Sequence, residues 1–191
     1  HGFDDDHAII SQLSPINRYG YSKQLFDVQA LAEGWLESIA GLKFFNVFGP
    51  NEFHKDTMRS IICKSFPDVR DTGEMRLFKS YHPDYKDGGQ LRDFVYVKDC
   101  VDVMWWLLNH SDVNGLFNVG TGQSRSWNDV AKSLFNALDK PPEITYFDMP
   151  EPLKNQYQYY TKASMDKLKK AGYTTSFMSL EEAVSDYVSG Y

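Results

Sequence analysis

Short apolar runs alternate with longer segments of helical period along most of this chain. The runs are bounded by Gly, Pro, Asn or Asp, and the segments between them repeat apolar residues every three or four positions. This alternation is typical of α/β proteins, in which helices cover a largely parallel sheet. We expect strands at residues 42–48, 75–79, 92–97, 116–119 and 143–147, an extended segment near 156–161, and helices at 19–39, 57–66, 99–109, 127–138, 164–171 and 180–189.

Residues that favour the ends of helices and strands support these boundaries. Asn17 is a candidate cap for the first helix, and Gly41 is a candidate for its end. The Gly-Pro pair at 49–50 stops the first strand. Ser126 and Asp129 have the spacing of a capping box, with Asp in place of the usual Glu or Gln, so a helix should begin immediately after Ser126.

Composition excludes several classes of protein. The 20 basic and 26 acidic residues give a net charge of −6, and no basic stripe is present, which argues against a nucleic-acid surface. The longest apolar run, residues 103–108, is far shorter than the ~20 residues of a membrane span. Cys63 and Cys100 lie far apart, as expected for free thiols in the cytoplasm, and the five His show no metal-ligand spacing. We therefore expect no membrane, nucleic-acid or metal partner.

Tyr19 and Lys23 form a Tyr-x-x-x-Lys pair in the first expected helix. Residues four apart share one face of a helix, so the ammonium group can favour the phenolate and prepare the tyrosine for proton transfer. The alternative is an ordinary surface pair, because a chain with 12 tyrosines and many lysines gives about one such match by chance.

Asn46 and Lys55 lie at and after the end of the strand at 42–48. In α/β proteins, ligands bind beyond the carboxyl ends of strands, where an Asn can contact a sugar and a Lys can titrate or bind phosphate. The alternatives are an Asn that bonds to the local backbone and a solvated loop lysine.

The Gly-Thr-Gly at 120–122 follows a strand and precedes a helix. Arg125 stands where a dinucleotide-binding fingerprint has its third glycine, and no acidic residue ends a following strand about 20 residues on. The sequence therefore favours a tight turn before a capped helix over a cofactor loop.

Four motifs in one order resemble the extended short-chain dehydrogenase/reductases that modify nucleotide sugars. They are Tyr-x-x-x-Lys on a helix, a strand that ends Phe-Asn-Val-Phe-Gly-Pro, Arg-Asp-Phe-Val-Tyr-Val-x-Asp, and Phe-Asn-Val-Gly-Thr-Gly. Within that family, the stretches at 46–58, 77–80 and 157–173 are similar to the epimerases that act at C6 of ADP-heptose. The resemblance covers nearly the whole chain from Asn17 onward.

The resemblance implies isomerase chemistry through a transient ketone, in lipopolysaccharide core precursor synthesis. NADP, or NAD in its place, would take hydride from C6 of the heptose and return it to the opposite face. Tyr19 and Lys55 would exchange protons at the two faces, and Lys23 would hold the nicotinamide ribose and polarise Tyr19. Cofactor binding would fall to Lys23, Val47 and Lys55, and substrate binding to Asn46, Thr57, Lys64, Phe78, Lys79, Ser80, Tyr81, Arg92 and Tyr157.

The resemblance assigns more specific roles within this set. Residues 78–81 match the segment that contacts the ADP moiety, Arg92 would pair with the pyrophosphate, and Tyr157 would close over the substrate. Lys64 stands where some members of the family bear His, which is a departure from the pattern.

The resemblance also implies a domain organisation. Residues 1–56 would be the C-terminal part of a Rossmann-type, doubly wound parallel sheet. Residues 57–191 would be mainly a smaller α/β substrate-binding domain, with about 92–120 returning to the Rossmann domain. The Gly-x-x-Gly-x-x-Gly unit of the family is not in this sequence, so we expect a C-terminal portion that lacks most of the cofactor site and is inactive by itself. Because an apolar surface would be uncovered, we expect this portion either to self-associate or to show disorder near its N-terminus. The parent protein is expected to be a homo-oligomer.

Two alternatives remain at the level of sequence. One is another NAD(P)-dependent nucleotide-sugar enzyme, such as a 4-epimerase, a 4,6-dehydratase or a reductase. Lys55 and residues 77–81 favour the heptose enzyme over these. The other is a nucleotide-sugar binding module without turnover.

Overall fold

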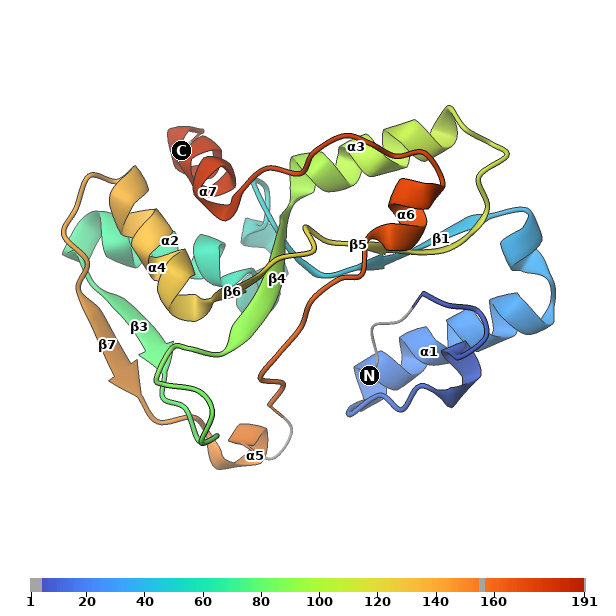
Figure 1. The fold of residues 1–191 in the computed structure, drawn as a ribbon. Coiled ribbons are helices and arrows are strands. Elements are labelled where there is room, and N and C mark those ends of the chain that lie inside the picture. Colours follow the sequence, from blue (N-terminus) through green and yellow to red (C-terminus); the bar gives the residue numbers. More distant parts are fainter. Residues whose placement is uncertain (1–4, 155–156, 191) are drawn as a thin grey trace.

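The computed structural model describes residues 5–154 and 157–190, and it confirms the α/β class (Figure 1). Three small sheets contain the strands. β1 (Ala40–Phe44) pairs with β5 (Gly115–Val119), and β3 (Met75–Phe78) pairs with β7 (Ile144–Phe147), both in parallel. The third sheet has the order β2–β4–β6, from β2 (Asn46–Phe48), β4 (Leu91–Tyr96) and β6 (Ser124–Ser126); β2 is parallel to β4 and β6 is antiparallel to it.

Helices follow the strands in the manner expected of crossover connections. The α-helices are α1 (Arg18–Ala32), α2 (Ile61–Thr72), α3 (Val97–Leu108), α4 (Trp127–Ala137), α5 (Glu151–Lys154), α6 (Asp166–Lys170) and α7 (Leu180–Ser189). The described residues also form three short 3₁₀ helices: η1 (Ile10–Gln12) before α1, and η2 (Trp35–Glu37) and η3 (Phe53–Met58) between α1 and α2. Within the described residues, none of these helices combines the length and apolarity that crossing a membrane would take.

Strand β5 is covered on both of its faces. Alternate side chains of a strand point to opposite sides, and Leu116 packs with Ala30 and Leu36 from the α1 side, whereas Phe117 packs with Val103 from α3. Figure 1 accordingly shows α1 and α3 on opposite sides of the β1–β5 pair. This arrangement explains why residues 115–119 are apolar nearly throughout, as in strands of parallel sheets.

The largest core lies at the other end of the molecule, around α2, α4 and α7. Phe66 of α2, Phe135 of α4 and Tyr187 of α7 are buried there together with Phe94 of β4. The capping box of α4 is present as predicted, with Ser126 accepting from the backbone N–H of Asp129 and Asp129 accepting from the N–H of Ser126. Residues of β3 and β4 are buried in this core, which therefore holds β4 and the start of the loop after β3 in place.

The predicted strand at 42–48 is two strands that belong to different sheets. The N–H of Phe45 still donates to the carbonyl of Val119, the last residue of β5, at 3.0 Å, but the N–H of Val47 donates to the carbonyl of Phe45 at 2.9 Å. The chain turns sharply around Asn46 and continues as β2 beside β4. The single-strand prediction is therefore wrong, because the two halves find partners that lie far away in the sequence.

Two helix predictions also need correction. The first helix does not run from 19 to 39 and does not end at Gly41: α1 ends at Ala32, because Gly34 takes a left-handed conformation with φ of 71°. The helix predicted at 57–66 is α2, which begins after the Ser60 cap and ends at Gly73, where φ is 76°. Residues 53–58 form η3 instead. The cap at Asn17 is confirmed.

Sequence patterns also missed β6, α5 and η1, each of which has only three or four residues. Elements this short contain too few residues for a period to be visible. Of the extended segment expected near 156–161, Tyr160 forms a parallel bridge with Leu91, and residues 155–156 lie outside the described part.

The segment before α1 lies along the free edge of β5. The ring of His7 accepts a hydrogen bond from the N–H of Leu116 at 3.1 Å, and Asp5 accepts from the N–H of Asn118 at 2.9 Å. Burial lowers the pKa of His7, and the nearby Lys167 lowers it further, whereas Asp6 and Asp5 oppose them. The folded protein therefore holds this imidazole neutral.

We expect His7 to make folding weaker in mild acid. Below pH ~6.5 the unfolded chain binds a proton that the folded state resists, so the free energy of unfolding falls as the pH drops toward the lower, folded pKa. The loss should be roughly a few tenths of a kcal/mol, because the ring is partly solvated. Urea unfolding between pH 7.5 and 5.5 measures it.

The control pair is His7→Gln and His110→Gln. Glutamine at position 7 can accept from Leu116 without titrating, so this variant should lose part of the acid sensitivity, while His110→Gln, at an exposed position after the end of α3, should keep it. Equal pH dependence of all three proteins would contradict this account of His7.

Candidate functional site

The predicted Tyr19–Lys23 pair is formed on the first turns of α1. The Lys23 ammonium group lies 5.2 Å from the centroid of the Tyr19 ring, as expected for residues four apart on one helical face. Tyr19 is 72% exposed, and Lys23 is exposed as well. The phenol and the ammonium group are therefore together and accessible to a ligand.

Asn46 and Val47 lie on β2, opposite Phe94 and Val95 of β4. Asn46 is exposed, at the sharp turn where the chain leaves the β1–β5 pair, and Val47 is partly buried. Asn46 thus follows the end of β1 and begins β2, and the ligand contacts expected of Asn46 and Val47 stay a prediction.

The loop from β2 to α2 carries Lys55 and Thr57, both exposed. Its organising residue is one that sequence analysis missed, Glu52, which is 4% exposed. One oxygen of its carboxylate accepts from the N–H of Gly49 at 3.2 Å and from the hydroxyl of Ser60 at 2.7 Å, and the other accepts from the N–H of Ser60 at 2.8 Å. The carboxylate also lies 3.6 Å from the ammonium group of Lys55.

The structure brings Phe78, Arg92 and Tyr157 together from three separate parts of the chain. The guanidinium group of Arg92 lies 5.2 Å from the centroid of the Tyr157 ring and 5.9 Å from that of Trp127, and Phe78 meets Tyr157 edge-on at 6.4 Å. Trp127 donates a hydrogen bond of 3.0 Å to the hydroxyl of Tyr157. Trp127 was not among the predicted site residues.

Arg92 is a buried cation held by neutral groups. It is 7% exposed, and it donates to the carbonyl groups of Leu91 and Gln158. None of the ion pairs found among the described residues includes Arg92. Burial lowers the pKa of its guanidinium group and raises the pKa of the Tyr157 phenol. A buried guanidinium without a carboxylate is well suited to bind an anionic ligand, because such a ligand would neutralise it.

Lys79, Ser80 and Tyr81 continue from the end of β3 around a second acidic residue that sequence analysis missed. Asp148 accepts hydrogen bonds from the Tyr81 hydroxyl at 2.7 Å and from the Lys79 ammonium group at 3.2 Å. The Asp148 hydrogen bond raises the pKa of Tyr81. The N–H of Tyr81 donates to the hydroxyl of Tyr159, whose ring meets that of Tyr157 edge-on. The segment predicted to contact ADP therefore adjoins the group formed by Phe78, Arg92, Trp127 and Tyr157, which we call the Arg92 cluster.

Lys64 lies on the exposed side of α2, in the turn after the Ser60 cap. The contacts described here link it to neither the Arg92 cluster nor Lys55, and its substrate role stays a prediction. The same holds for the expected placement of Tyr19 and Lys55 on opposite sides of one cleft.

The Gly-Thr-Gly at 120–122 is a tight turn, as favoured above, and a buried carboxylate fills it. Asp93 is fully buried and accepts from the N–H and hydroxyl of Thr121, the N–H of Gly122 and the N–H of Ala163, at 2.7–3.0 Å. A Cβ at Gly120 would lie 2.7 Å from Ala163 and 2.9 Å from Asp93. This turn therefore has no room for a cofactor phosphate.

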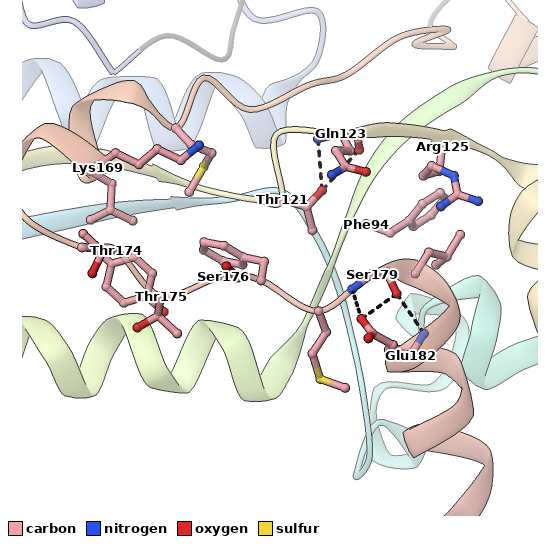
Figure 2. Close-up of a pocket in the computed structure, with 16 residues that line it drawn as sticks. Phe94, Thr121, Gln123, Arg125, Lys169, Thr174, Thr175, Ser176, Ser179 and Glu182 are labelled. Atoms are coloured by element: carbon pink, nitrogen blue, oxygen red, sulfur yellow. Dashed lines mark hydrogen bonds between the residues drawn. The ribbon is translucent and has the colours of Figure 1, made fainter.

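A cavity of about 600 Å³ lies beside this turn, between the segment at 174–176 and Phe94 (Figure 2). None of the predicted site residues lines it. Two charged groups at its rim already have partners within the protein. Arg125 pairs with Glu181 at 2.5 Å, and Glu182 accepts a hydrogen bond from the Ser179 N–H at 2.9 Å. We assign it no ligand, since the residues with site chemistry lie elsewhere.

Comparison with known proteins places these residues in context. Residues 3–120 match the NAD dependent epimerase/dehydratase family. Over its whole length, the chain is 58% identical to an ADP-L-glycero-D-manno-heptose-6-epimerase of Nitratidesulfovibrio vulgaris (strain DP4) and 43% identical to one of Fusobacterium nucleatum, covering 59% and 60% of those proteins. The chain thus spans about three fifths of the length of these curated relatives.

Solved structures agree with the fold. The crystal structure of Helicobacter pylori ADP-L-glycero-D-manno-heptose-6-epimerase matches with a TM-score of 0.75 and 30% identity, over 93% of this chain and 52% of that one. Thermus thermophilus UDP-glucose 4-epimerase in complex with NAD matches with a TM-score of 0.72 over 92% of this chain and 54% of that one, at 22% identity, which supports the fold alone.

Proposed function

The chain belongs to the NAD dependent epimerase/dehydratase family, and from this premise we propose that the whole enzyme, a protein of its relatives' full length that contains this chain, epimerises ADP-heptose at C6. The observation that carries the proposal is the 58% identity, over the entire chain, to a protein of that name. The Tyr19–Lys23 pair and the Arg92 cluster support it, since they supply proton transfer and anion binding.

The residues present fit the nicotinamide end of a dinucleotide cofactor. An exposed phenol beside an exposed ammonium group can donate to the ribose hydroxyls of NADP or NAD. Val47 of β2 would contact the cofactor through its backbone. The pyrophosphate end is not provided by the Gly-Thr-Gly turn, which Asp93 and Ala163 fill. When bound, the cofactor supplies the acceptor and later the donor of the C6 hydride. NADP is our preferred cofactor and NAD the alternative.

We assign Tyr19 and Lys55 to proton exchange at the C6 oxygen, which must lose a proton as the ketone forms and regain one on reduction. Lys23, whose ammonium group lies 5.2 Å from the centroid of the Tyr19 ring, would hold the nicotinamide ribose beside it. Re-reduction on the other face needs a second donor, and Lys55, half-exposed on the loop after β2, is the group we place there. Asn46 and Thr57 would hold the sugar.

We assign the Arg92 cluster to the ADP moiety. The guanidinium group would bind the diphosphate, and Tyr157 would cover it, while residues 78–81 would contact the nucleoside. The division into a Rossmann part (1–56, with about 92–120) and a substrate part (57–191) is part of the same proposal. So are a cytoplasmic location and a homo-oligomeric state, the latter supported by exposed apolar side chains of α1 such as Leu25 and Phe26.

Replacing Arg92 with Ala should weaken ADP binding about 10- to 150-fold, because one charge-assisted hydrogen bond is worth ~1.5–3 kcal/mol. Titration calorimetry with ADP measures the loss, and circular dichroism checks that the variant is folded. Arg76→Ala is the matched control, because Arg76 is an exposed arginine of β3 that also lies over an aromatic ring, Phe147. Equal ADP affinity of wild type and the Arg92 variant would remove Arg92 from the site.

The two alternatives, another nucleotide-sugar enzyme and a binding module without turnover, can be distinguished by measuring the binding and the turnover of ADP-heptose. A 4-epimerase or a dehydratase would bind ADP-heptose weakly and change another carbon. A binding module would bind ADP-heptose, lose affinity when Arg92 is replaced, and show no turnover in the whole enzyme.

A further inference from the structure

One buried side chain controls the loop that carries Lys55. The hydrogen bonds of the Glu52 carboxylate go to Gly49, directly after β2, and to Ser60, the cap of α2. The hydroxyl of Ser60 accepts in turn from the N–H of Cys63, in the first turn of α2. Glu52 therefore joins the two ends of the loop to each other and to the helix that follows.

The same carboxylate is the partner of the Lys55 ammonium group, at 3.6 Å. The N–H of Lys55 also donates to the carbonyl of Glu52 at 2.9 Å, which fixes the spacing of the two residues. The pair is asymmetric: the side chain of Glu52 is 5% exposed and that of Lys55 is 44% exposed. The acidic end is fixed in the fold, and the basic end remains free to meet a ligand.

The backbone on both sides of this pair is strained. Asn51 and Asp56, neither of them glycine, have φ of 67° and 51°. Such conformations persist only where the surroundings impose them, and they occur often at functional sites. Here the surroundings include a carboxylate that ties the loop at Gly49 and Ser60.

We propose that Glu52 is the positioning residue for Lys55, which it holds at the end of β2 by closing the loop and by pairing with the ammonium group. The role of Glu52 in epimerisation rests on the proposed function, but its pairing with Lys55 can be tested independently of that function. A residue with only a structural role would close the loop without affecting the reactivity of the Lys55 amine.

The test measures the rate at which Lys55 reacts with an amine-reactive anhydride at one fixed pH, by mass spectrometry of the 191-residue chain. Glu52→Gln keeps the size of the side chain and one of its two acceptor oxygens but removes its charge. We expect Lys55 to react about two- to fivefold faster in this variant, the range for the loss of a partly exposed ion pair. Asp27→Asn is the matched control, because Asp27 pairs with Lys43 at 3.0 Å.

Faster labelling of Lys55 in Glu52→Gln and not in Asp27→Asn supports the proposal, and an unchanged labelling rate of Lys55 in folded Glu52→Gln overturns it. If that variant does not fold, the wild-type chain is labelled at low and high salt. Screening should then speed the labelling of Lys55 more than that of Lys170, on the exposed side of α6, and equal changes overturn the proposal.

Kinetics of the whole enzyme then test the link to catalysis. Glu52→Gln should lower kcat with little change in KM, and Glu52→Asp, which keeps the charge, should recover part of kcat. If Lys55→Ala leaves turnover unchanged, the proposed role of Lys55 fails, while the labelling result for Glu52 stands.

Discussion

Replacing Tyr19 with Phe should lower the turnover of ADP-heptose by the whole enzyme about 10²- to 10⁴-fold, the range for loss of a general acid–base group. The change removes only the hydroxyl group, so the ring that lies beside Lys23 remains. ADP binding should be unaffected, since the Arg92 cluster does not include Tyr19. Turnover and ADP affinity are measured on the same preparation.

Tyr21→Phe is the control, because Tyr21 is also an exposed tyrosine of α1 but points in another direction, two residues further along. It should leave turnover within about twofold of wild type, since a surface hydroxyl away from the site contributes little. Full activity in the Tyr19 variant, or equal losses in both variants, would remove Tyr19 from the mechanism.

Replacing Asp93 with Ala should cost about 3–5 kcal/mol of the free energy of unfolding, because it leaves several buried donors without an acceptor. Three of these are backbone N–H groups, of Thr121, Gly122 and Ala163, which cannot turn toward water. The Asp93 carboxylate joins three parts of the chain: β4, the turn at 120–122 and the segment before α6. Urea unfolding of the chain measures it.

Asp186→Ala is the matched control. Asp186 accepts two short hydrogen bonds, from the Tyr96 hydroxyl and the Lys98 ammonium group, both at 2.6 Å. The Lys98 ammonium group is exposed and can turn to water, so only the hydroxyl of the buried Tyr96 loses this acceptor, and the loss should be smaller than for Asp93. Similar losses for the two variants would contradict the role given to Asp93.

The parts of the fold that could be predicted are those set by local interactions. Helix α4 begins where its capping box predicts, because Ser126 and Asp129 act over one turn. The strand at 42–48 could not be divided correctly, since its break depends on β4 and β5, which lie about 45–75 residues away. Helix α1 was predicted too long because apolar spacing continues past Gly34.

The same distinction applies to the candidate site. Tyr19 and Lys23 could be paired from spacing alone, because a helix fixes residues four apart. The contact of Arg92 with Tyr157 joins residues 65 apart, and only the family resemblance suggested it. Glu52, Asp93 and Asp148 gave no signal, because a lone carboxylate has no pattern until the fold brings its donors together.

The central claim is C6 epimerisation, and one measurement tests it most directly. The whole enzyme is incubated with ADP-L-glycero-D-manno-heptose and catalytic NADP, the sugar is followed by proton NMR, and reduced nicotinamide is followed by absorbance. We predict that the C6 epimer forms until both epimers are in equilibrium, without loss of water and without accumulation of reduced cofactor. Inversion at C4, elimination of water, or binding of ADP-heptose without any conversion would contradict the account.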